Sequence, residues 1–262
     1  MKTSRIIAAA TLIATASGVH AGTPELNPVI APAPAESNGW DFLVSMYSPM
    51  MGVDGTVGVG PLTGPIDIPF SDILSNLDAG FFSNFEARGN RWSVNGDIIW
   101  LKMSSSVAPT QRSYLGVKQE QFMTTLTTGY ELYEDERTIF DIFGGAALTS
   151  LELELNETTF AVRRGVLNRS ASGSKTWIDP ILGLRVRHHL SDRWTLFALG
   201  AYGGFGVGSE EYWQLVGGVN FRLTEHASIA LAYRGIGVDY NDSGFIYNTK
   251  TYGPNLGLVF NF

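Results

Sequence analysis

The last eleven residues of the chain alternate strictly between two kinds of side chain. Every second position carries a large apolar residue or proline, and the positions between carry glycine, asparagine or valine. A period of two is the spacing of a β-strand, whose side chains point in turn to its two faces. The chain therefore ends on a strand with one oily face, built from Tyr252, Pro254, Leu256, Leu258, Phe260 and Phe262.

Similar strand-like alternation recurs along the chain and predicts ten strands in all. Short connections such as Gly89-Asn90 alternate with longer ones, of which three are long: 52–77, 104–119 and 156–174. Tight turns on one rim and longer loops on the other are typical of bacterial membrane barrels. The expected strands are 40–51, 78–88, 91–103, 120–133, 138–155, 175–189, 193–207, 211–222, 226–240 and 248–262.

The first 21 residues have the layout of a secretory signal peptide. A basic start is followed by the apolar run 6–16 and by a small-x-small exit at Val19-His20-Ala21. Residues 22–39 are rich in proline and alanine, which predicts an extended periplasmic linker. No other stretch approaches 18 consecutive apolar residues, so a membrane crossing would need a closed barrel, expected over 40–262.

Charge and cysteine content exclude several classes of protein. The net charge is −7, and removal of Lys2 and Arg5 with the signal peptide makes it more negative, which argues against nucleic acid as a partner. The chain has no cysteine, so it has neither disulfides nor a thiolate metal site. We expect no bound metal and no cofactor.

The predicted strands pair an apolar face with a polar one, and periodicity does not say which face meets solvent. Strand lengths of about ten residues or more suit a tilted membrane strand. Aromatic residues at strand ends predict an interfacial girdle: Trp40, Trp92, Trp177, Trp194 and Tyr133. These features favour apolar side chains facing lipid. The alternative is a soluble periplasmic lipocalin-like binder with an oily interior.

A membrane barrel would place the polar face of each strand in its lumen. Ten strands enclose a narrow lumen that side chains can fill, and charges of mixed sign there imply pairing. We expect a mostly filled lumen with a structural role, and a narrow conducting path is the alternative. The expected lumen network is Glu86, Arg88, Asn95, Asp97, Glu131, Asp179, Arg185, Arg187, Gln214, Asn220, Arg222 and Arg234.

One helix is expected in the mature chain, over 68–78 in the first long loop. Ser71 is its candidate cap, and Ile73, Leu74 and Leu77 form an apolar stripe. These residues predict a short plug or lid helix at the outer mouth.

An enzyme that acts on lipid or peptide at the outer rim is a further alternative. Histidine is the usual base at neutral pH, but His188, His189 and His226 all lie at short turns on the opposite rim. We therefore assign no catalytic residues. The acidic residues near the outer loops suggest either a solvated rim or a divalent-cation bridge to lipopolysaccharide: Glu210, Glu211, Asp239 and Asp242.

Several segments resemble an uncharacterised group of small bacterial outer-membrane β-barrel proteins. They are "WIDPILGLR" (177–185), "GAYGGFGVGS" (200–209), "AYRG" (232–235), "YGPNLG" (252–257) and "FSDILSNLDAG" (70–80). The resemblance implies an antiparallel transmembrane barrel in the cell outer membrane, with outer-membrane lipids and lipopolysaccharide as partners. It also implies that the barrel-assembly machinery reads the terminal strand at Tyr252, Leu256, Leu258, Phe260 and Phe262.

Overall fold

The computed structural model describes residues 39–110, 113–161 and 165–262. The expected signal peptide and nearly all of the expected linker lie outside the described residues. The described part contains one short helix, α1 (Phe70–Asn76), and twelve strands. The strands are β1 (Asp41–Pro49), β2 (Gly52–Val59), β3 (Leu62–Ile68), β4 (Leu77–Gly89), β5 (Trp92–Thr110), β6 (Ser113–Glu134), β7 (Thr138–Ala161), β8 (Gly165–His189), β9 (Trp194–Gly204), β10 (Glu211–Arg222), β11 (Ala227–Asp242) and β12 (Phe245–Asn261).

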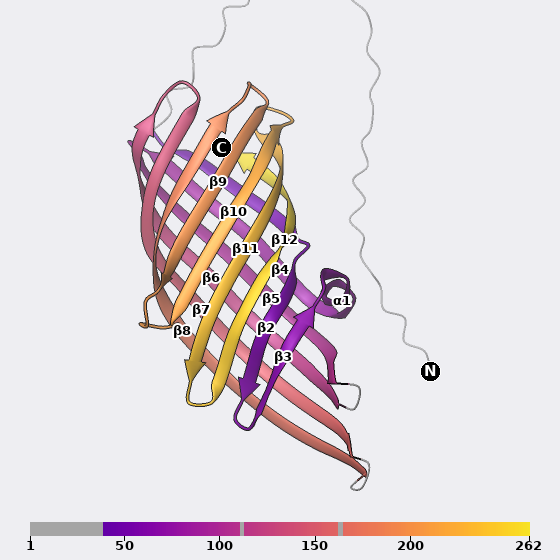
Figure 1. Cartoon of the computed structure of the whole chain (residues 1–262). Helices are drawn as coiled ribbons and strands as arrows, with labels where there is room; N and C mark the ends of the chain where they lie inside the picture. The colour runs from indigo at the N-terminus through magenta and orange to yellow at the C-terminus, as the bar shows by residue number, and fades with distance from the viewer. Residues whose placement is uncertain (1–38, 111–112, 162–164) are drawn as a thin grey trace, which may run out of the picture. The chain divides into compact units, whose positions relative to one another are not determined.

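Ten of these strands close into an antiparallel barrel (Figure 1). Each strand from β4 to β12 pairs with the next in sequence, and β1 joins the two ends of the sheet. Met46 of β1 pairs with Leu258 of β12 on one side and with Ser83 of β4 on the other. The prediction of a closed barrel of about ten antiparallel strands is confirmed. We call the end where β1 begins and β12 ends the terminal rim, and the opposite end the distal end.

The first long loop predicted from sequence is largely a β-hairpin. Strand β2 continues along β12 beyond the end of β1, and it pairs with β3, as in Thr251↔Val53↔Ile68. In this hairpin residues 53–59 pair with 62–68, from Val53↔Ile68 to Val59↔Leu62.

The other two long loops predicted from sequence are wrong, because the described residues of both segments are strand. Beyond Met103, β5 pairs with β6, and β7 pairs with β8 as far as Ala161↔Gly165. Their outward side chains are mostly polar, as Lys118, Ser170 and Ser172 show, which gave these segments the composition of loops. In the first segment the inward side chains are apolar, as Leu115 and Val117 show. The second segment extends β7 beyond the buried inward residues Leu153 and Leu155.

Toward the distal end the barrel divides into two four-stranded sheets. Strand β4 starts at the level of Met103, and β9 reaches only to Ile181 of β8, so the longer strands continue without these neighbours. The strands β5–β8 form one sheet, and β11, β12, β2 and β3 form the other, which lies in front of it in Figure 1. Cross-sheet contacts are close: a Cβ on Gly64 of β3 would lie 3.0 Å from Leu115 Cδ2 of β6.

The space between these two sheets holds the apolar core of the protein. Its members come from both sheets and from the distal end of β10, and most are less than a tenth exposed. Two sheets packed face to face bury their inner faces in this way. The core includes Val57, Leu62, Ile66, Ile68, Leu115, Val117, Leu151, Leu153, Leu155, Trp177, Tyr212, Phe245 and Tyr247.

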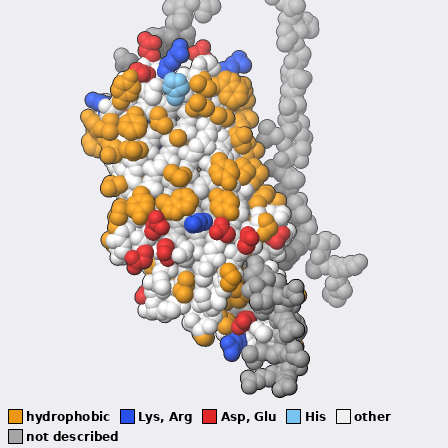
Figure 2. Space-filling view, viewed as in Figure 1, with side chains coloured by type: hydrophobic (Ala, Val, Ile, Leu, Met, Phe, Trp, Pro, Cys, Tyr) orange, Lys and Arg blue, Asp and Glu red, His pale blue; other side chains and the backbone are white. Residues whose placement is uncertain are grey.

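Nearer the terminal rim the polarity is reversed, and large apolar side chains cover the outside. Trp92, Trp194 and Tyr133 are exposed at this rim, as the girdle prediction requires. Figure 2 shows the apolar cover on one face of the barrel, bordered on its distal side by acidic side chains with a basic side chain among them. The prediction that Trp177 belongs to the girdle is wrong, because this residue lies well inside β8 and is only 5 % exposed. The alternating pattern placed Trp177 on a strand but did not show how far it lies from the end of that strand.

Candidate functional site: the barrel lumen

The predicted lumen residues are distributed over three places in the barrel. Ten of the twelve line a cavity inside the ten-stranded part: Glu86, Arg88, Asn95, Asp97, Arg185, Arg187, Gln214, Asn220, Arg222 and Arg234. Glu131 is buried near the terminal rim, where it lies 3.5 Å from Arg88 and 3.6 Å from Arg91.

Asp179 lies apart from the other eleven, in the distal core. It is fully buried and accepts hydrogen bonds from Trp177 Nε1 at 3.1 Å and from the backbone N–H of Ser209 at 2.6 Å. The carboxylate therefore ties the β9–β10 connection to β8, and it does not belong to the network around the lumen cavity.

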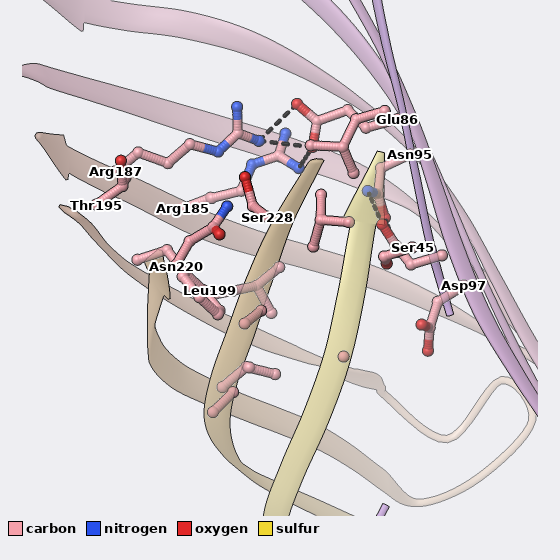
Figure 3. Close-up of a pocket in the computed structure, with 18 of the residues that line it drawn as sticks. Ser45, Glu86, Asn95, Asp97, Arg185, Arg187, Thr195, Leu199, Asn220 and Ser228 are labelled. Carbon is pink, nitrogen blue, oxygen red and sulfur yellow. Dashed lines mark hydrogen bonds and ion pairs between the residues drawn. The ribbon is translucent and has the colours of Figure 1, made fainter. Parts of the chain in front are cut away.

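The centre of the lumen network is Glu86, on the inward face of β4. Arg185 Nη1 donates to Glu86 Oε2 at 2.9 Å, and Arg187 Nη2 lies 2.5 Å from Glu86 Oε1 (Figure 3). Arg88 Nε lies 3.3 Å from the same carboxylate. A buried carboxylate is costly unless cations and hydrogen bonds surround it, and here three guanidinium groups do so.

Asp141 of β7 completes this cluster, and sequence reasoning missed it. Arg185 Nε donates to Asp141 Oδ2 at 3.0 Å, and Arg88 pairs with the same carboxylate. Glu86, Glu131 and Asp141 face Arg88, Arg185 and Arg187 inside the barrel, and the more exposed Arg91 adds a fourth cation at Glu131. The available signal was position: Asp141 stands between Phe140 and Ile142, at the inward phase of its strand.

A second, separate ion pair lies deeper in the lumen, at the floor of the cavity. Arg234 Nη2 of β11 donates to Asp97 Oδ2 of β5 at 2.6 Å. Tyr47 of β1 links both partners, since its hydroxyl donates to Asp97 Oδ1 at 2.9 Å and accepts from Arg234 Nη1 at 2.8 Å. Tyr47 was not predicted. The triad separates the polar lumen from the distal apolar core.

The lumen cavity has a volume of about 680 Å³ and two unlike walls. The ion cluster lies on strands β4 to β8, and the facing strands β9 to β12 present smaller and less polar side chains (Figure 3). Leu199, Val216, Ala230 and Ala232 belong to this second wall. The cavity extends to the terminal rim, where Arg222, His226 and Phe262 line it.

The predicted plug helix exists as α1, but it lies at the side of the distal end. Pro69 is its N-cap and no side chain caps it, so the assignment of Ser71 as cap is wrong. Ile73 packs against the apolar core, whereas Leu74 is 59 % exposed and Leu77 begins β4. The helix covers the seam between β3 and β5, over a small apolar cavity of about 110 Å³. The hairpin β2–β3 fills the position over the lumen that was expected for the helix.

The remaining predicted residues lie on the outer surface or at the rims. The alternate residues Tyr252, Leu256, Leu258 and Phe260 of the terminal strand point outward and are exposed, and Phe262, just beyond the strand, is exposed at the mouth of the cavity. His188 and His189 lie by the terminal rim, bonded to Thr138 and Thr195. Within the described residues, no three acidic or histidine side chains group together as a metal site. No described helix is long and apolar enough to span a membrane.

Comparison with known proteins identifies the fold and not the activity. No protein-family model and no curated protein sequence matches the chain. Among solved structures, the outer membrane protease OmpT from Escherichia coli aligns with 87 % of this chain and 98 % of its own, at a TM-score of 0.55 and 9 % identity. The fold is that of the bacterial outer-membrane β-barrels.

Two further barrel proteins also align over most of their length, but at lower TM-scores. The attachment invasion locus protein Ail of Yersinia pestis matches at 14 % identity and a TM-score of 0.33, over 86 % of this chain and 99 % of its own. Neisserial surface protein A matches at 10 % identity and a TM-score of 0.33, over 86 % and 100 %. At such identities the similarity covers the fold alone, so function has to be argued from the lumen and the surface of this chain.

Proposed function

We propose that this chain is an integral outer-membrane protein whose barrel does not conduct and whose role is structural. It carries the two distal sheets outside the cell. The observation that carries this proposal is the closure of the distal end, where the hairpin β2–β3 and the sheet β5–β8 share a dry apolar core. Ions crossing the lumen would have to pass this core, and desolvating a charge among leucine and valine side chains is prohibitive.

The outer surface supports a membrane location. Large apolar side chains surround the barrel near the terminal rim, while the matching inward positions hold the ion cluster. A soluble lipocalin-like binder would have the opposite polarity in this half. On this proposal the apolar cover contacts outer-membrane lipids, the charged row beside it meets lipopolysaccharide, and the assembly machinery reads the exposed terminal strand.

A non-enzymatic role is part of the proposal. OmpT is a protease, but the likeness to it extends only to the fold. The histidines of the described residues lie by the terminal rim, far from the distal end where an enzyme of the outer surface would act. An unchanged lipid A profile in a deletion strain, and no cleavage of a peptide library by the purified protein, are the expected results.

Conductance in a planar bilayer tests the closed lumen. The matched variant deletes residues 53–68 and joins Gly52 to Pro69. The two residues are close enough to be joined, because a Cβ on Gly52 would lie 3.5 Å from Pro69 Cα. We expect no steady single-channel conductance from the native protein and measurable conductance from the deletion variant. Heat-modifiable migration on a gel shows whether each barrel is folded. Steady conductance from the native protein, or none from a folded deletion variant, would contradict the proposal.

A further inference from the structure

The lumen cavity has the features of a binding site that opens at the terminal rim. Its volume of about 680 Å³ lies within the range of roughly 300–1,000 Å³ that is typical of small-molecule pockets. It runs along β10 from Arg222 at the rim to Gln214 at the floor, a path of roughly 26 Å at about 3.3 Å per residue. Side chains of a ten-stranded barrel can fill its interior, so a cavity of this size calls for an explanation.

The space exists because one wall is built from small side chains. Ala230 and Ala232 of β11 and Gly257 of β12 face the cavity, together with Leu199 and Val216. The arginines of the opposite wall do not cross to fill the gap, because Glu86 and Asp141 hold them on their own side. An uncharged, partly aliphatic surface therefore faces the open space over most of its length.

The mouth of the cavity carries two arginines without an ion pair among the described residues, and Asp41, which also lines the mouth, pairs with neither. Arg193 and Arg222 both line the cavity, and their backbones are neighbours, since Arg222 N donates to Arg193 O at 2.9 Å. Neither guanidinium has an ion-pair partner within 4 Å among the described residues, whereas Arg185, Arg187 and Arg234 all do.

The floor supplies a second observation that points to a ligand. Arg234 and Asn255 are both more than nine-tenths buried and both line the cavity. Arg234 Nε and Asn255 Oδ1 have no hydrogen-bond partner within the described part of the chain. Buried polar atoms without a hydrogen bond are rare and costly. The unpaired donor and acceptor at the floor therefore indicate that a polar group of a ligand, or a water, binds there.

We propose that the lumen cavity binds a small amphiphilic anion that enters from the terminal rim. Its carboxylate or phosphate group lies between Arg193 and Arg222, and its apolar body lies along the wall of Leu199, Val216 and Ala232. The inward end reaches the floor, where Arg234 Nε–H donates to a polar group or a bound water and Asn255 Oδ1 accepts from one. The proposal does not depend on whether the distal end is closed to ions.

Calorimetric titration of octanoate into the full-length mature protein in lipid nanodiscs tests this site, with empty nanodiscs as the blank. We expect saturable binding at one site, and binding of acetate that is at least about tenfold weaker, because acetate lacks the apolar body. The double variant R193Q/R222Q is expected to weaken octanoate binding about tenfold or more, because hydrogen bonds to charged groups are lost. The variant K250Q removes a cation from the distal surface and should bind octanoate as the native protein does.

Filling the cavity separates a lumen site from lipid headgroups held at the rim. A232F, and the milder A230L, place new bulk beside the aliphatic wall and should abolish octanoate binding or weaken it at least tenfold, with folding checked by heat-modifiable migration. Octanoate binding that survives in both folded variants would place the anion at the rim or in the bilayer and overturn the proposal. Equal binding of acetate and octanoate, or no signal above the blank, would also overturn it. The cavity would then hold water only, on the order of 20 molecules.

Discussion

The indole ring of Trp177 stacks on the phenol ring of Tyr240, with ring centroids 3.9 Å apart and planes inclined by 14°. Trp177 belongs to β8 and Tyr240 to β11, and no backbone pairing joins these strands at this level, because β9 and β10 have already ended. Side-chain contacts therefore close this seam between the two distal sheets. A salt bridge lies beside the stack, with Lys175 Nζ 2.5 Å from Asp242 Oδ2.

Replacement of Trp177 with alanine should open this seam. The side chain is buried in the apolar core and also donates to Asp179, so its loss removes packing and leaves a buried carboxylate with one donor fewer. Truncation of a buried tryptophan costs about 3–5 kcal/mol. Urea unfolding in lipid vesicles should show a loss of this order. The control is W92A, at an exposed position on the terminal rim, which should lose clearly less; equal losses would show that Trp177 does not hold the sheets together.

The Lys175–Asp242 bridge should make the seam sensitive to acid. Hydrogen bonds from Lys175 and Ser243 lower the pKa of Asp242, and the bond to Asp242 raises the pKa of Lys175. A lowered carboxyl pKa contributes stability above its unfolded value of about 3.9, and this stability is lost as pH falls through the folded value. The raised lysine pKa contributes below about 10.4 and is lost as pH rises through the folded value. The bridge is therefore complete between about pH 5 and pH 9.

Hydrogen exchange at the distal ends of β8 and β11 measures this pH dependence. Exchange, corrected for its intrinsic pH dependence, should speed up at pH 3 relative to pH 7 in the native protein, and the variant D242N should already be fast at pH 7. E154Q is the matched control, because Glu154 forms a comparable exposed bridge with Lys118 within one sheet. If E154Q loosens the seam as much as D242N does, the bridge has no special role.

The sequence predicted the barrel because alternation and turn spacing are local properties. It did not predict the two distal sheets, because the face that carries the apolar side chains changes along the strands. Near the terminal rim the apolar face points outward, and at the distal end it points inward. Leu126 and Leu182 face outward near the terminal rim, whereas Leu153 and Leu155 of the same sheet face inward further along. Alternation is the same in both regions, so composition made the distal segments look like loops.

The ion pairs in the lumen depend on closure of the barrel. The sequence therefore predicted which residues face the lumen, but not which of them pair with each other. Arg187 and Glu86 are 101 residues apart in sequence, and they meet because β4 and β8 face the same lumen. Polar residues at inward positions were recognisable on each strand, which is how ten residues of the cavity wall could be named. Which carboxylate meets which arginine follows from strand register and tilt, and these are properties of the closed sheet.

Removal of Glu86 alone should destabilise the barrel more than removal of Glu86 together with Arg187. The variant E86Q leaves Arg185 and Arg187 buried with too little negative charge, and breaking a buried pair in this way costs about 3–5 kcal/mol. The double variant E86Q/R187Q removes one charge of each sign and should recover part of the loss. Urea unfolding in vesicles measures both. A double variant that is less stable than E86Q would show that the charges do not act as a pair.

Gly145 should be indispensable for closing the barrel wall. A Cβ at this position would lie 2.0 Å from the backbone oxygen of Leu126 and 2.7 Å from Thr127 Cα on the neighbouring strand, a clash with backbone that no side-chain rotation relieves. G145A should therefore reduce the yield of heat-modifiable, folded protein sharply, because β6 and β7 would have to separate. The matched control is G217A on β10, where a Cβ meets no atom within 4 Å. Native yield from G145A would mean that β6 and β7 can move apart at this point without loss of the barrel.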